Sequence, residues 1–454
     1  EHSTDLTPGA IAAVGQNLFA KLRPYGGTAC LAIGGGSGLT FDAPAGSPFA
    51  GLRIRRKGDW VLLRRSEGLP GAADWSHEEA NAANTGASTD RFVKAPLGLL
   101  WFNAPREWQR KPGGAVVRVA GGRVLVKSNK LLAIDVFTGR HLWEATLPFA
   151  HTVTDQLVAT PDAIYATGGK TCAILDPATG EETRRIELPD ALPGAWQNLR
   201  CWENYLVSTN GKFVVCVNHE TGEVLWRQEC NRAALSLSVG GGRVFCAELL
   251  NPRRGELEHS AVKTRAFDIR SGEIVWEIAS GSKVLYSESL DLVVTATGVH
   301  QGATGKRLHA LPEPPKPVNG RPLPVVPGPL FVIGDKLLWG TVQDFVVFDL
   351  KTGQRTGDHT AWVRRGCTTI RASEHLVTTR VRANAAYIDL ESREPTSLWN
   401  IRPACMNNLY PANGVLNAPN VIGGCTCNYT HTSQAYVPVN EIERASFGQK
   451  KNDR

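Results

Sequence analysis

One phrase of hydrophobic and polar positions recurs along most of the chain. A run of β-branched or other apolar residues is followed by Asp or Asn, two variable residues, Thr or Ser, and Gly. The run predicts a strand, and the Asp or Asn side chain can accept bonds from the backbone amides of the following turn. Gly supplies the positive φ that a hairpin with a bulge requires. The clear copies are LLAIDVFTG, CAILDPATG, VVCVNHETG, TRAFDIRSG and FVVFDLKTG.

The phrase returns about every 40 residues, a period typical of a β-propeller with one four-stranded sheet per repeat. The last residues of the copies are Gly139, Gly180, Gly222, Gly272 and Gly353, with weaker copies ending at Gly305 and Arg393. We expect these glycines to occupy equivalent turns of successive blades. A tryptophan follows four residues after the glycine in three copies, at Trp143, Trp226 and Trp276. An indole at a fixed place in each blade is expected to pack against the neighbouring blade.

Composition agrees with a strand-rich globular protein. The 454 residues include 46 Gly, and 42% of positions are hydrophobic, which excludes disorder of the whole chain. The net charge of +7 is mild and the basic pairs are scattered, so no nucleic-acid partner is expected. No run approaches the ~18 apolar residues of a membrane span. The chain begins at Glu1 without a basic and then apolar leader, so we expect any signal peptide to be absent or removed.

The repeated phrase with its tryptophan resembles the PQQ-like propeller superfamily, which includes quinoprotein alcohol dehydrogenases and an outer-membrane-assembly lipoprotein. DWSHEEANAANTG resembles the first strand and loop of bacterial members, and RPACMNNLYPANGVLNAP with CTCNYTHTSQAYVP resembles their last blade. The resemblance implies an all-β, eight-bladed PQQ-like β-propeller over residues 71–440, with a Pro-rich insertion between blades at 310–329. Residues 441–454 are expected to be a polar tail. A bacterial protein acting in the periplasm or after secretion is implied.

Residues 1–70 have a different pattern. IAAVGQNLFAKLRPYGG has helical spacing, TACLAI predicts a short strand, and LRIRRKGDWVLLRR predicts a hairpin. This order is similar to the C-terminal end of class I methyltransferase folds, so we expect a small α/β segment. The glycine cluster IGGGSGL lacks the Lys and Ser or Thr of a P-loop and is interpreted as a turn.

Four of the 10 cysteines lie near the C-terminus in loops rich in Gly, Asn, Pro and Thr: Cys367, Cys405, Cys425 and Cys427. Loop cysteines at this density are typical of disulfides in an oxidising compartment or of a metal site. We expect at least two of the four to be bonded to each other. A thiolate site for zinc, or for copper with Met406, His375 or His431, is the alternative. Cys172, Cys216 and Cys246 lie in apolar strand-like runs, where a small buried side chain is expected.

Polar residues of the same region are candidates for a binding face built by the first and last blades. Arginine and asparagine donors suit carboxylate- or hydroxyl-rich ligands, and tyrosine with arginine or histidine suits a β-elimination at a uronate. The ligand-binding candidates are Arg364, Arg365, Asn407, Asn408 and Asn413. The catalytic candidates are His77, Arg371, Arg402, Tyr410 and Tyr429.

Within the resemblance, bound PQQ requires a disulfide between adjacent cysteines, a tryptophan floor, Ca²⁺ held by Glu and Asn, and an Asp base. The chain has no adjacent cysteines and no C-x-x-C-H haem motif, so PQQ is not expected as a cofactor. Our leading hypothesis is a non-quinone binding scaffold for a polar or saccharide ligand or for a protein partner. The alternative is an enzyme at the same face, either of the polysaccharide lyase type or a metal-dependent oxidoreductase that uses the C-terminal cysteines. A PQQ dehydrogenase ranks third.

Overall fold

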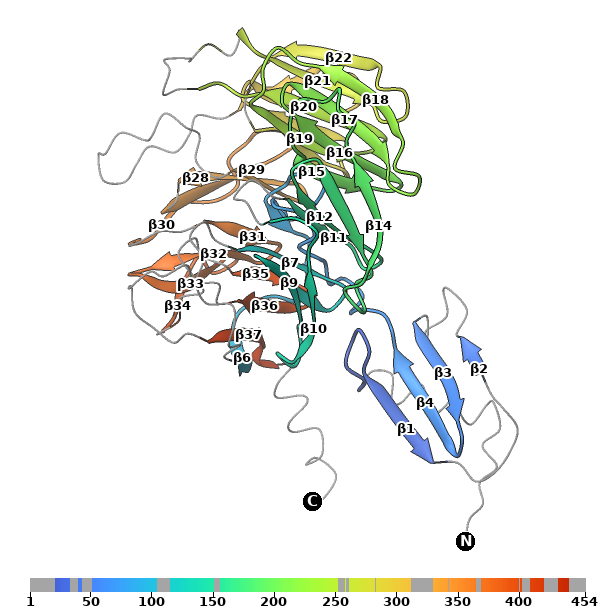
Figure 1. Cartoon of the computed structure of the whole chain (residues 1–454). Coiled ribbons are helices and arrows are strands. Elements are labelled where there is room, and N and C mark those ends of the chain that lie inside the picture. The colour runs from blue at the N-terminus through green and yellow to red at the C-terminus, as the bar shows by residue number, and fades with distance from the viewer. Residues whose placement is uncertain are drawn as a thin grey trace. The chain divides into compact units, whose positions relative to one another are not determined.

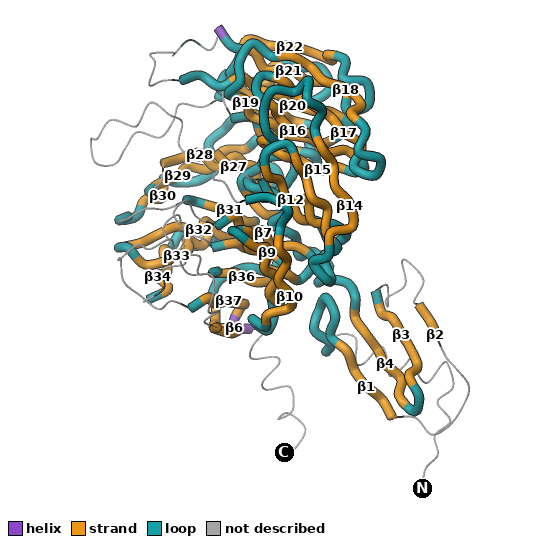
Figure 2. The backbone as a smooth tube through the Cα atoms, viewed as in Figure 1, coloured by secondary structure: helices purple, strands orange, loops and turns teal. Residues whose placement is uncertain are grey.

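The computed structural model describes residues 21–32, 40–42, 51–103, 115–150, 156–251, 258, 261–281, 283–311, 330–341, 343–364, 369–399, 401, 409–419 and 432–440. Strands and turns make up almost all of them (Figure 2). The chain divides into two compact units, Glu1–Ala72 and Ala73–Arg454. No helix within the described ranges is long and apolar enough to cross a membrane.

The first unit contains one antiparallel sheet with the strand order β1-β4-β3-β2. Its strands are β1 (Thr28–Ala32), β2 (Thr40–Asp42), β3 (Leu52–Lys57) and β4 (Trp60–Arg65). Alternating residues of β3 and β4 bury Leu52, Ile54, Val61 and Leu63 on one face. The predicted strand and hairpin are therefore confirmed. Most of the predicted helix and the whole glycine cluster lie outside the described residues.

Among its described residues, the second unit contains eight sheets, which are drawn in Figure 1, and we number them sheets 1–8. Sheet 1 contains β7 (Val116–Ala120), β8 (Arg123–Lys127), β9 (Lys130–Asp135) and β10 (His141–Thr146). Sheet 2 contains β11 (Leu157–Ala159), β12 (Ile164–Gly168), β13 (Thr171–Leu175) and β14 (Glu182–Glu187). Sheet 3 contains β15 (Gln197–Trp202), β16 (Tyr205–Asn210), β17 (Phe213–Asn218) and β18 (Val224–Glu229). Sheet 4 contains β19 (Leu235–Gly240), β20 (Arg243–Glu248), β21 (Lys263–Asp268) and β22 (Ile274–Ala279).

The remaining sheets continue this up-and-down order. Sheet 5 contains β23 (Leu285–Ser287), β24 (Leu292–Thr295), β25 (Gly298–Gln301) and β26 (Arg307–His309). Sheet 6 contains β27 (Leu330–Ile333), β28 (Lys336–Thr341), β29 (Asp344–Asp349) and β30 (Thr360–Ala361). Sheet 7 contains β31 (Arg371–Ser373), β32 (Leu376–Val381), β33 (Asn384–Asp389), β34 (Pro395–Leu398) and the short β5 (Ala87–Ser88). Sheet 8 contains β35 (Tyr410–Ala412), β36 (Val415–Ala418), β37 (Ser433–Pro438) and β6 (Leu97–Asn103).

The ring closes through a strand from its own beginning. The inner strand of each sheet contacts the next inner strand, with β5 lying between β27 and β31, and β35 contacts β7. Sheet 8 takes its outermost strand, β6, from the part of the chain that precedes sheet 1, and β6 pairs antiparallel with β37. The second unit is thus a multi-bladed β-propeller, as the repeat predicted. The Pro-rich stretch connects β26 of sheet 5 to β27 of sheet 6, and residues 312–329 within it are outside the described ranges.

The repeated phrase forms the same turn in each copy. The glycine amide donates to the carbonyl of the Asp, Asn or Gln four residues earlier, as Gly180 does to Asp176 at 2.8 Å. The Asp176 carboxylate accepts from the amide of Thr179, and its counterparts accept equivalent bonds. The six predicted glycines all have φ between 68° and 77°, so their equivalence is confirmed. Arg393 keeps the turn at φ 64° without a glycine.

Tryptophans of the outer strands join neighbouring sheets. The Trp226 ring of sheet 3 lies against Gly272 of sheet 4, and its Nε1 donates to the Ile269 carbonyl at 2.7 Å. Trp143 and Trp276 make the same contacts with the sheets that follow them, so the predicted packing role is confirmed. The sequence analysis missed Trp101 of β6, which packs on Gly139 and donates to the Val136 carbonyl at 2.6 Å. His309 takes the place of a tryptophan between sheets 5 and 6.

Two glycines of sheet 4 allow the cost of this packing to be measured. Gly242 and Gly272 both have φ +73°, but a Cβ at Gly242 meets nothing within 4 Å, whereas one at Gly272 lies 2.6 Å from the Trp226 ring. We expect Gly242→Ala to lower the free energy of unfolding by about 1–2 kcal/mol through backbone strain. Gly272→Ala should lower it by about 1–3 kcal/mol more, because the indole must move. Equilibrium urea unfolding measures both, and equal losses would contradict the packing role.

Candidate functional site

A single segment, residues 73–90, contacts every sheet of the propeller from the inside, and we call it the axial segment. Trp75 and Val119 of β7 exchange two backbone hydrogen bonds of 2.7 and 3.1 Å. The next inner strands donate to the axial segment in ring order, through the amides of Ala159, Cys201, Val239, Tyr286 and Val332. β5 then pairs parallel with β31 of sheet 7, and Asp90 accepts from the Gly414 amide of sheet 8 at 2.8 Å.

Small residues and two unusual backbone conformations let the axial segment turn within this space. Its middle reads ANAANTGAS. Ala80 is fully buried at φ 74° and Asn84 lies at φ 58°, in the left-handed region that most residues avoid. Asn84 also fixes the turn through its side chain, because its Nδ2 donates to the Val284 carbonyl at 2.8 Å. The Asn81 Nδ2 donates to the Thr85 hydroxyl.

Three arginines on inner strands surround the axial segment: Arg118 of β7, Arg200 of β15 and Arg371 of β31. Arg118 and Arg200 are 5% and 3% exposed. Burial lowers the pKa of Arg118 to about 10, with Glu78 opposing the shift and Arg200 and Arg371 adding to it. Burial also lowers the pKa of Arg200. Arg200 and Arg371 are therefore close enough for their charges to act on Arg118.

Two carboxylates of the axial segment, Glu78 and Glu79, face these charges. Glu79 accepts from the Lys283 ammonium at 2.9 Å. Burial favours its neutral acid, but the attraction of Lys283, Arg371 and Arg200 outweighs burial and lowers the pKa of Glu79. Glu78 is exposed to solvent and attracts both Arg118 and Arg200. Glu78 therefore marks the side on which the arginine cluster meets water.

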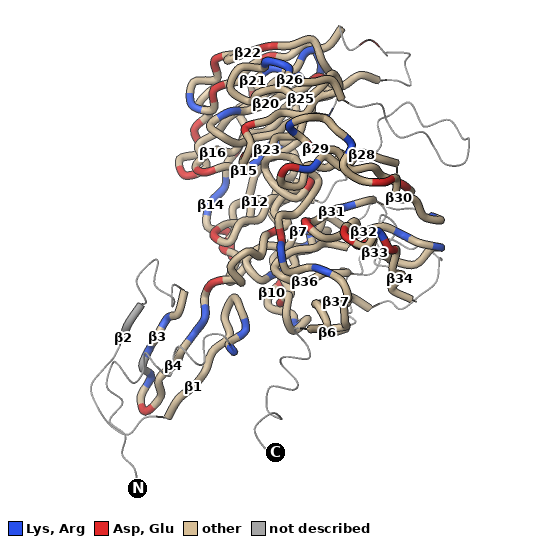
Figure 3. The backbone as a smooth tube through the Cα atoms, turned by 180° about the vertical axis from the view of Figure 1, so that it is seen from behind, with Lys and Arg blue, Asp and Glu red and all other residues tan. Residues whose placement is uncertain are grey.

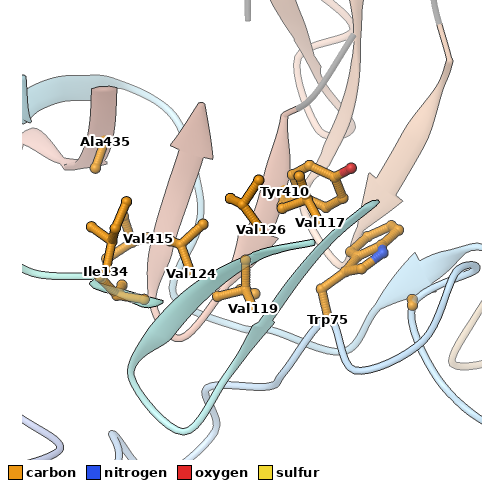
Figure 4. Packing of buried hydrophobic residues seen from close by; sticks show 12 residues of the cluster. Trp75, Val117, Val119, Val124, Val126, Ile134, Tyr410, Val415 and Ala435 are labelled. Atoms are coloured by element: carbon orange, nitrogen blue, oxygen red, sulfur yellow. The ribbon is translucent and has the colours of Figure 1, made fainter. Parts of the chain in front are cut away.

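Arg371 and Tyr410 were both predicted as site residues, and the structure brings them together. The Arg371 guanidinium donates to the Tyr410 hydroxyl at 3.1 Å and lies 4.2 Å from the centre of the Tyr410 ring. Trp75 packs edge to face on Tyr410, with the ring centres 5.6 Å apart (Figure 4). Apolar residues of sheets 1 and 8 surround the two rings. This aromatic pair holds the Arg371 guanidinium by a cation–π contact.

His77 lies against sheet 3, and not at the junction of the first and last sheets where we expected it. Its ring is 3% exposed, and its Nε2 accepts a hydrogen bond from the Cys201 amide at 3.0 Å. Nδ1 must therefore carry the proton and donate to the Ser76 hydroxyl, 2.7 Å away. Burial, followed by the charges of Arg200 and Arg118, lowers the pKa of His77 well below its usual value. Both ring nitrogens have structural partners, so His77 holds the axial segment in place.

Asn413 was predicted to bind a ligand, but its side chain joins the two ends of the ring. It is fully buried, accepts from the Gly122 amide at 2.8 Å, and donates to Asp74 at 2.6 Å. Arg364 follows β30 in the link between sheets 6 and 7 and is half-buried. The other predicted site residues lie outside the described ranges: Arg365, Cys367, Arg402, Cys405, Asn407, Asn408, Cys425, Cys427 and Tyr429.

Sequence reasoning missed Arg118, Arg200 and Glu78. A signal for the arginines was present, since Arg118 lies within AVVRVA and Arg200 within NLRCW. A charged residue in the middle of a strand expected to be buried needs a partner. The repeated phrase predicted the turns that precede the outer strands, but it includes no residue of the inner strands.

Comparison with known proteins agrees with this architecture. The sequence model of the family described as outer membrane protein assembly factor BamB matches residues 98–201 and 201–388. The chain belongs to this family. It is a PQQ-like β-propeller, as the repeated turn and the packed tryptophans predicted. No curated protein matches the chain.

Three solved structures resemble this chain at low sequence identity. A europium-containing methanol dehydrogenase is 11% identical with a TM-score of 0.48, over 73% of this chain and 86% of that one. BamB from Moraxella catarrhalis is 13% identical with a TM-score of 0.38, over 65% and 95%. Hsv2 from Kluyveromyces lactis, with a complete loop 6CD, is 11% identical with a TM-score of 0.43, over 62% and 96%. These scores are too low to carry an argument about function.

The buried position of His77 has a consequence for stability. Because its folded pKa is depressed, the unfolded chain takes up a proton below pH ~6.5 that the folded protein does not. The free energy of unfolding should therefore decrease as the pH is lowered below ~6.5, by up to about 1.4 kcal/mol per pH unit for this group. His77→Gln should be less stable at pH 7.5, and its deficit should shrink by about 1 kcal/mol at pH 5.5.

Chemical unfolding at several pH values measures this deficit. The matched control is His141→Gln, which replaces an exposed histidine of β10 and should change the free energy of unfolding at pH 7.5 by less than about 0.5 kcal/mol. A deficit of His77→Gln that does not change with pH would contradict the neutral, buried imidazole.

Proposed function

We propose that this propeller is a binding scaffold whose arginine cluster receives an anionic, carboxylate-bearing group of a polar ligand or a protein partner. The cluster consists of Arg118, Arg200, Arg371 and Lys283, and it faces two carboxylates, Glu78 and Glu79. One observation carries the proposal: the buried guanidinium groups of Arg118 and Arg200 both face Glu78, a carboxylate that is itself exposed to solvent. A buried guanidinium is stabilised by an anion that faces it.

The details of the cluster support an external anion. The Nε of Arg200 is buried and has no hydrogen-bond acceptor within the described ranges. Glu78 is exposed, so an anion from solvent can approach the same charges that Glu78 neutralises. In the view of Figure 3, acidic and basic residues both appear along the propeller, whereas β3 and β4 of the first unit carry mainly basic ones. Guanidinium groups also suit carboxylates, because they donate in pairs.

A site outside the cytoplasm is part of the proposal. It is supported by the description of the family as an outer membrane protein assembly factor. The same description favours a protein partner, for which the anionic group is an acidic side chain or a chain terminus.

An enzyme at the same face is the second candidate, and one contact favours it. The Arg371 guanidinium donates to the Tyr410 hydroxyl, which brings together a candidate base and a candidate carboxylate-binding cation, the two groups that a β-elimination at a uronate uses. His77 cannot serve as the base of such a step while its Nε2 accepts from the Cys201 amide. The lyase hypothesis therefore rests on Tyr410 as the base.

The residues at the axis do not fit PQQ. The axial segment covers the inner strands of the sheets, and the adjacent-cysteine disulfide that the resemblance requires is missing from the sequence. We derive no step through a quinone. The metal hypothesis concerns the C-terminal cysteines, which lie outside the described ranges.

Isothermal titration calorimetry with citrate, glucuronate and a peptide of Asp and Glu residues tests the binding proposal. The Glu78 side chain makes no hydrogen bond or ion pair with another described residue, so Glu78→Gln removes only the competing charge and should tighten anion binding by about three- to thirty-fold. Arg371→Gln should weaken binding at least about tenfold. Binding should also weaken as salt is raised.

The matched control is Arg270→Gln, an exposed arginine in the turn of sheet 4, which should leave the affinity unchanged. Tight binding of the peptide alone would favour a protein partner, and tight binding of citrate or glucuronate would favour a small ligand. If all three probes bind the wild type, Glu78→Gln and Arg371→Gln equally, or do not bind at all, the proposal fails.

A further inference from the structure

Two cysteine thiols outside the arginine cluster form a pair between neighbouring sheets. Cys230 directly follows β18, the outer strand of sheet 3, and Cys246 lies on β20 of sheet 4. Their Sγ atoms are 3.9 Å apart, and both side chains are buried, at 3% and 2% exposure. They belong to the apolar cluster that joins the two sheets. The sulfurs are in contact but not bonded.

Hydrogen bonds hold the backbone on both sides of the pair. The Cys230 amide donates to the Lys212 carbonyl at 2.8 Å, within sheet 3. Cys246 is paired on both sides within sheet 4, with Leu237 of β19 and Arg265 of β21. The next residue after Cys230 is also fixed, since the Asn231 amide donates to Glu248 of β20 at 2.9 Å.

The surroundings favour Cys230 as the attacking sulfur. A hydrogen bond from Cys246 and the positive charge of Arg265 lower the pKa of Cys230, against the effect of burial. The pKa of Cys246 is raised because it donates to Cys230 and is buried. A thiolate is the nucleophile in thiol–disulfide exchange. Asn231, which follows Cys230 directly, is exposed, so Cys230 lies next to a residue at the solvent-exposed surface.

We propose that Cys230 and Cys246 are a redox modification site that forms a reversible disulfide between sheets 3 and 4. The oxidant is a disulfide reagent of the class of oxidised glutathione or a thiol–disulfide oxidoreductase. The Cys230 thiolate attacks one sulfur of the reagent, whose S–S bond breaks and releases one thiolate. Cys246 then loses its proton and attacks the Cys230 sulfur, expelling the second thiolate. Two protein thiols thus lose two protons and two electrons, and the reagent is reduced to two thiols.

The bond would join two sheets that otherwise meet through apolar packing and through hydrogen bonds such as those of Trp226 and Gln228. It would close a loop that includes all of β19, so the unfolded chain would lose conformational freedom and the oxidised propeller would be more stable. This inference does not depend on the binding proposal, because neither cysteine contacts the arginine cluster in any hydrogen bond or ion pair described above.

Peptide mapping of the intact protein tests the site. The protein is incubated with oxidised glutathione, alkylated, digested without reduction and analysed by mass spectrometry. We expect a disulfide-linked peptide that contains Cys230 and Cys246, which disappears on reduction, and a melting temperature that rises on oxidation. The rise should be absent in Cys230→Ala and in Cys246→Ala.

The matched control is Cys216→Ser, another buried thiol of the same apolar cluster, whose Sγ contacts the Ile269 carbonyl at 3.7 Å. This variant should still form the linked peptide and show the rise. Since mapping of the wild type needs no variant, poor folding of a variant leaves the test intact. The proposal is overturned if both cysteines are recovered only as alkylated thiols or as mixed disulfides with glutathione.

Discussion

The closed ring of sheets leaves strand edges to be paired at its centre, and the axial segment provides their partners. The inner strand of each antiparallel sheet has one unpaired edge, and buried amides on that edge must find acceptors. Inner-strand or turn amides of seven sheets donate to the axial segment, from Val119 in sheet 1 to Gly414 in sheet 8. Asp90 accepts from both Gly414 and Ala73, so the beginning and end of the segment are tied together. The segment therefore acts as a closed inner loop on which all eight sheets depend.

The axial segment also limits where a ligand could contact the inner strands. Since the axial segment is bonded to every sheet, it fills the place from which a bound molecule would otherwise contact the inner strands. The exposed residue of the segment near the arginines is Glu78, and the charges of the inner strands reach solvent there. The same constraint explains the unusual backbone at Ala80 and Asn84, because the segment must bend within a small circle while its amides stay bonded.

Much of the ring was predictable because its outer turns obey a local rule. Asp176 with Gly180, and each equivalent pair, sets a turn through bonds within five residues, so a single sequence reveals it. The inner residues follow no such rule. Arg118 contacts a carbonyl of sheet 2, and Arg200 contacts Asn84, 116 residues away in the chain. Trp101 was missed for the same reason, since its strand belongs to sheet 8 but comes before sheet 1. Of the predicted site, Arg371 and Tyr410 meet, whereas His77 and Asn413 hold the ring together.

The energetics of the axis suggest why the arginines are kept. Removing a guanidinium from water is costly unless its charge and its donors are matched. Arg118 matches two of its donors with carbonyls, and Arg200 matches one with a carbonyl and one with Asn84. Carbonyls satisfy donors but leave the charge, and the exposed carboxylate of Glu78 opposes both Arg118 and Arg200. The sheets and the axial segment hold these guanidinium groups in position whether or not a ligand is present. On the binding proposal, a site assembled in advance would lower the cost of ordering when a carboxylate enters, and so raise the affinity.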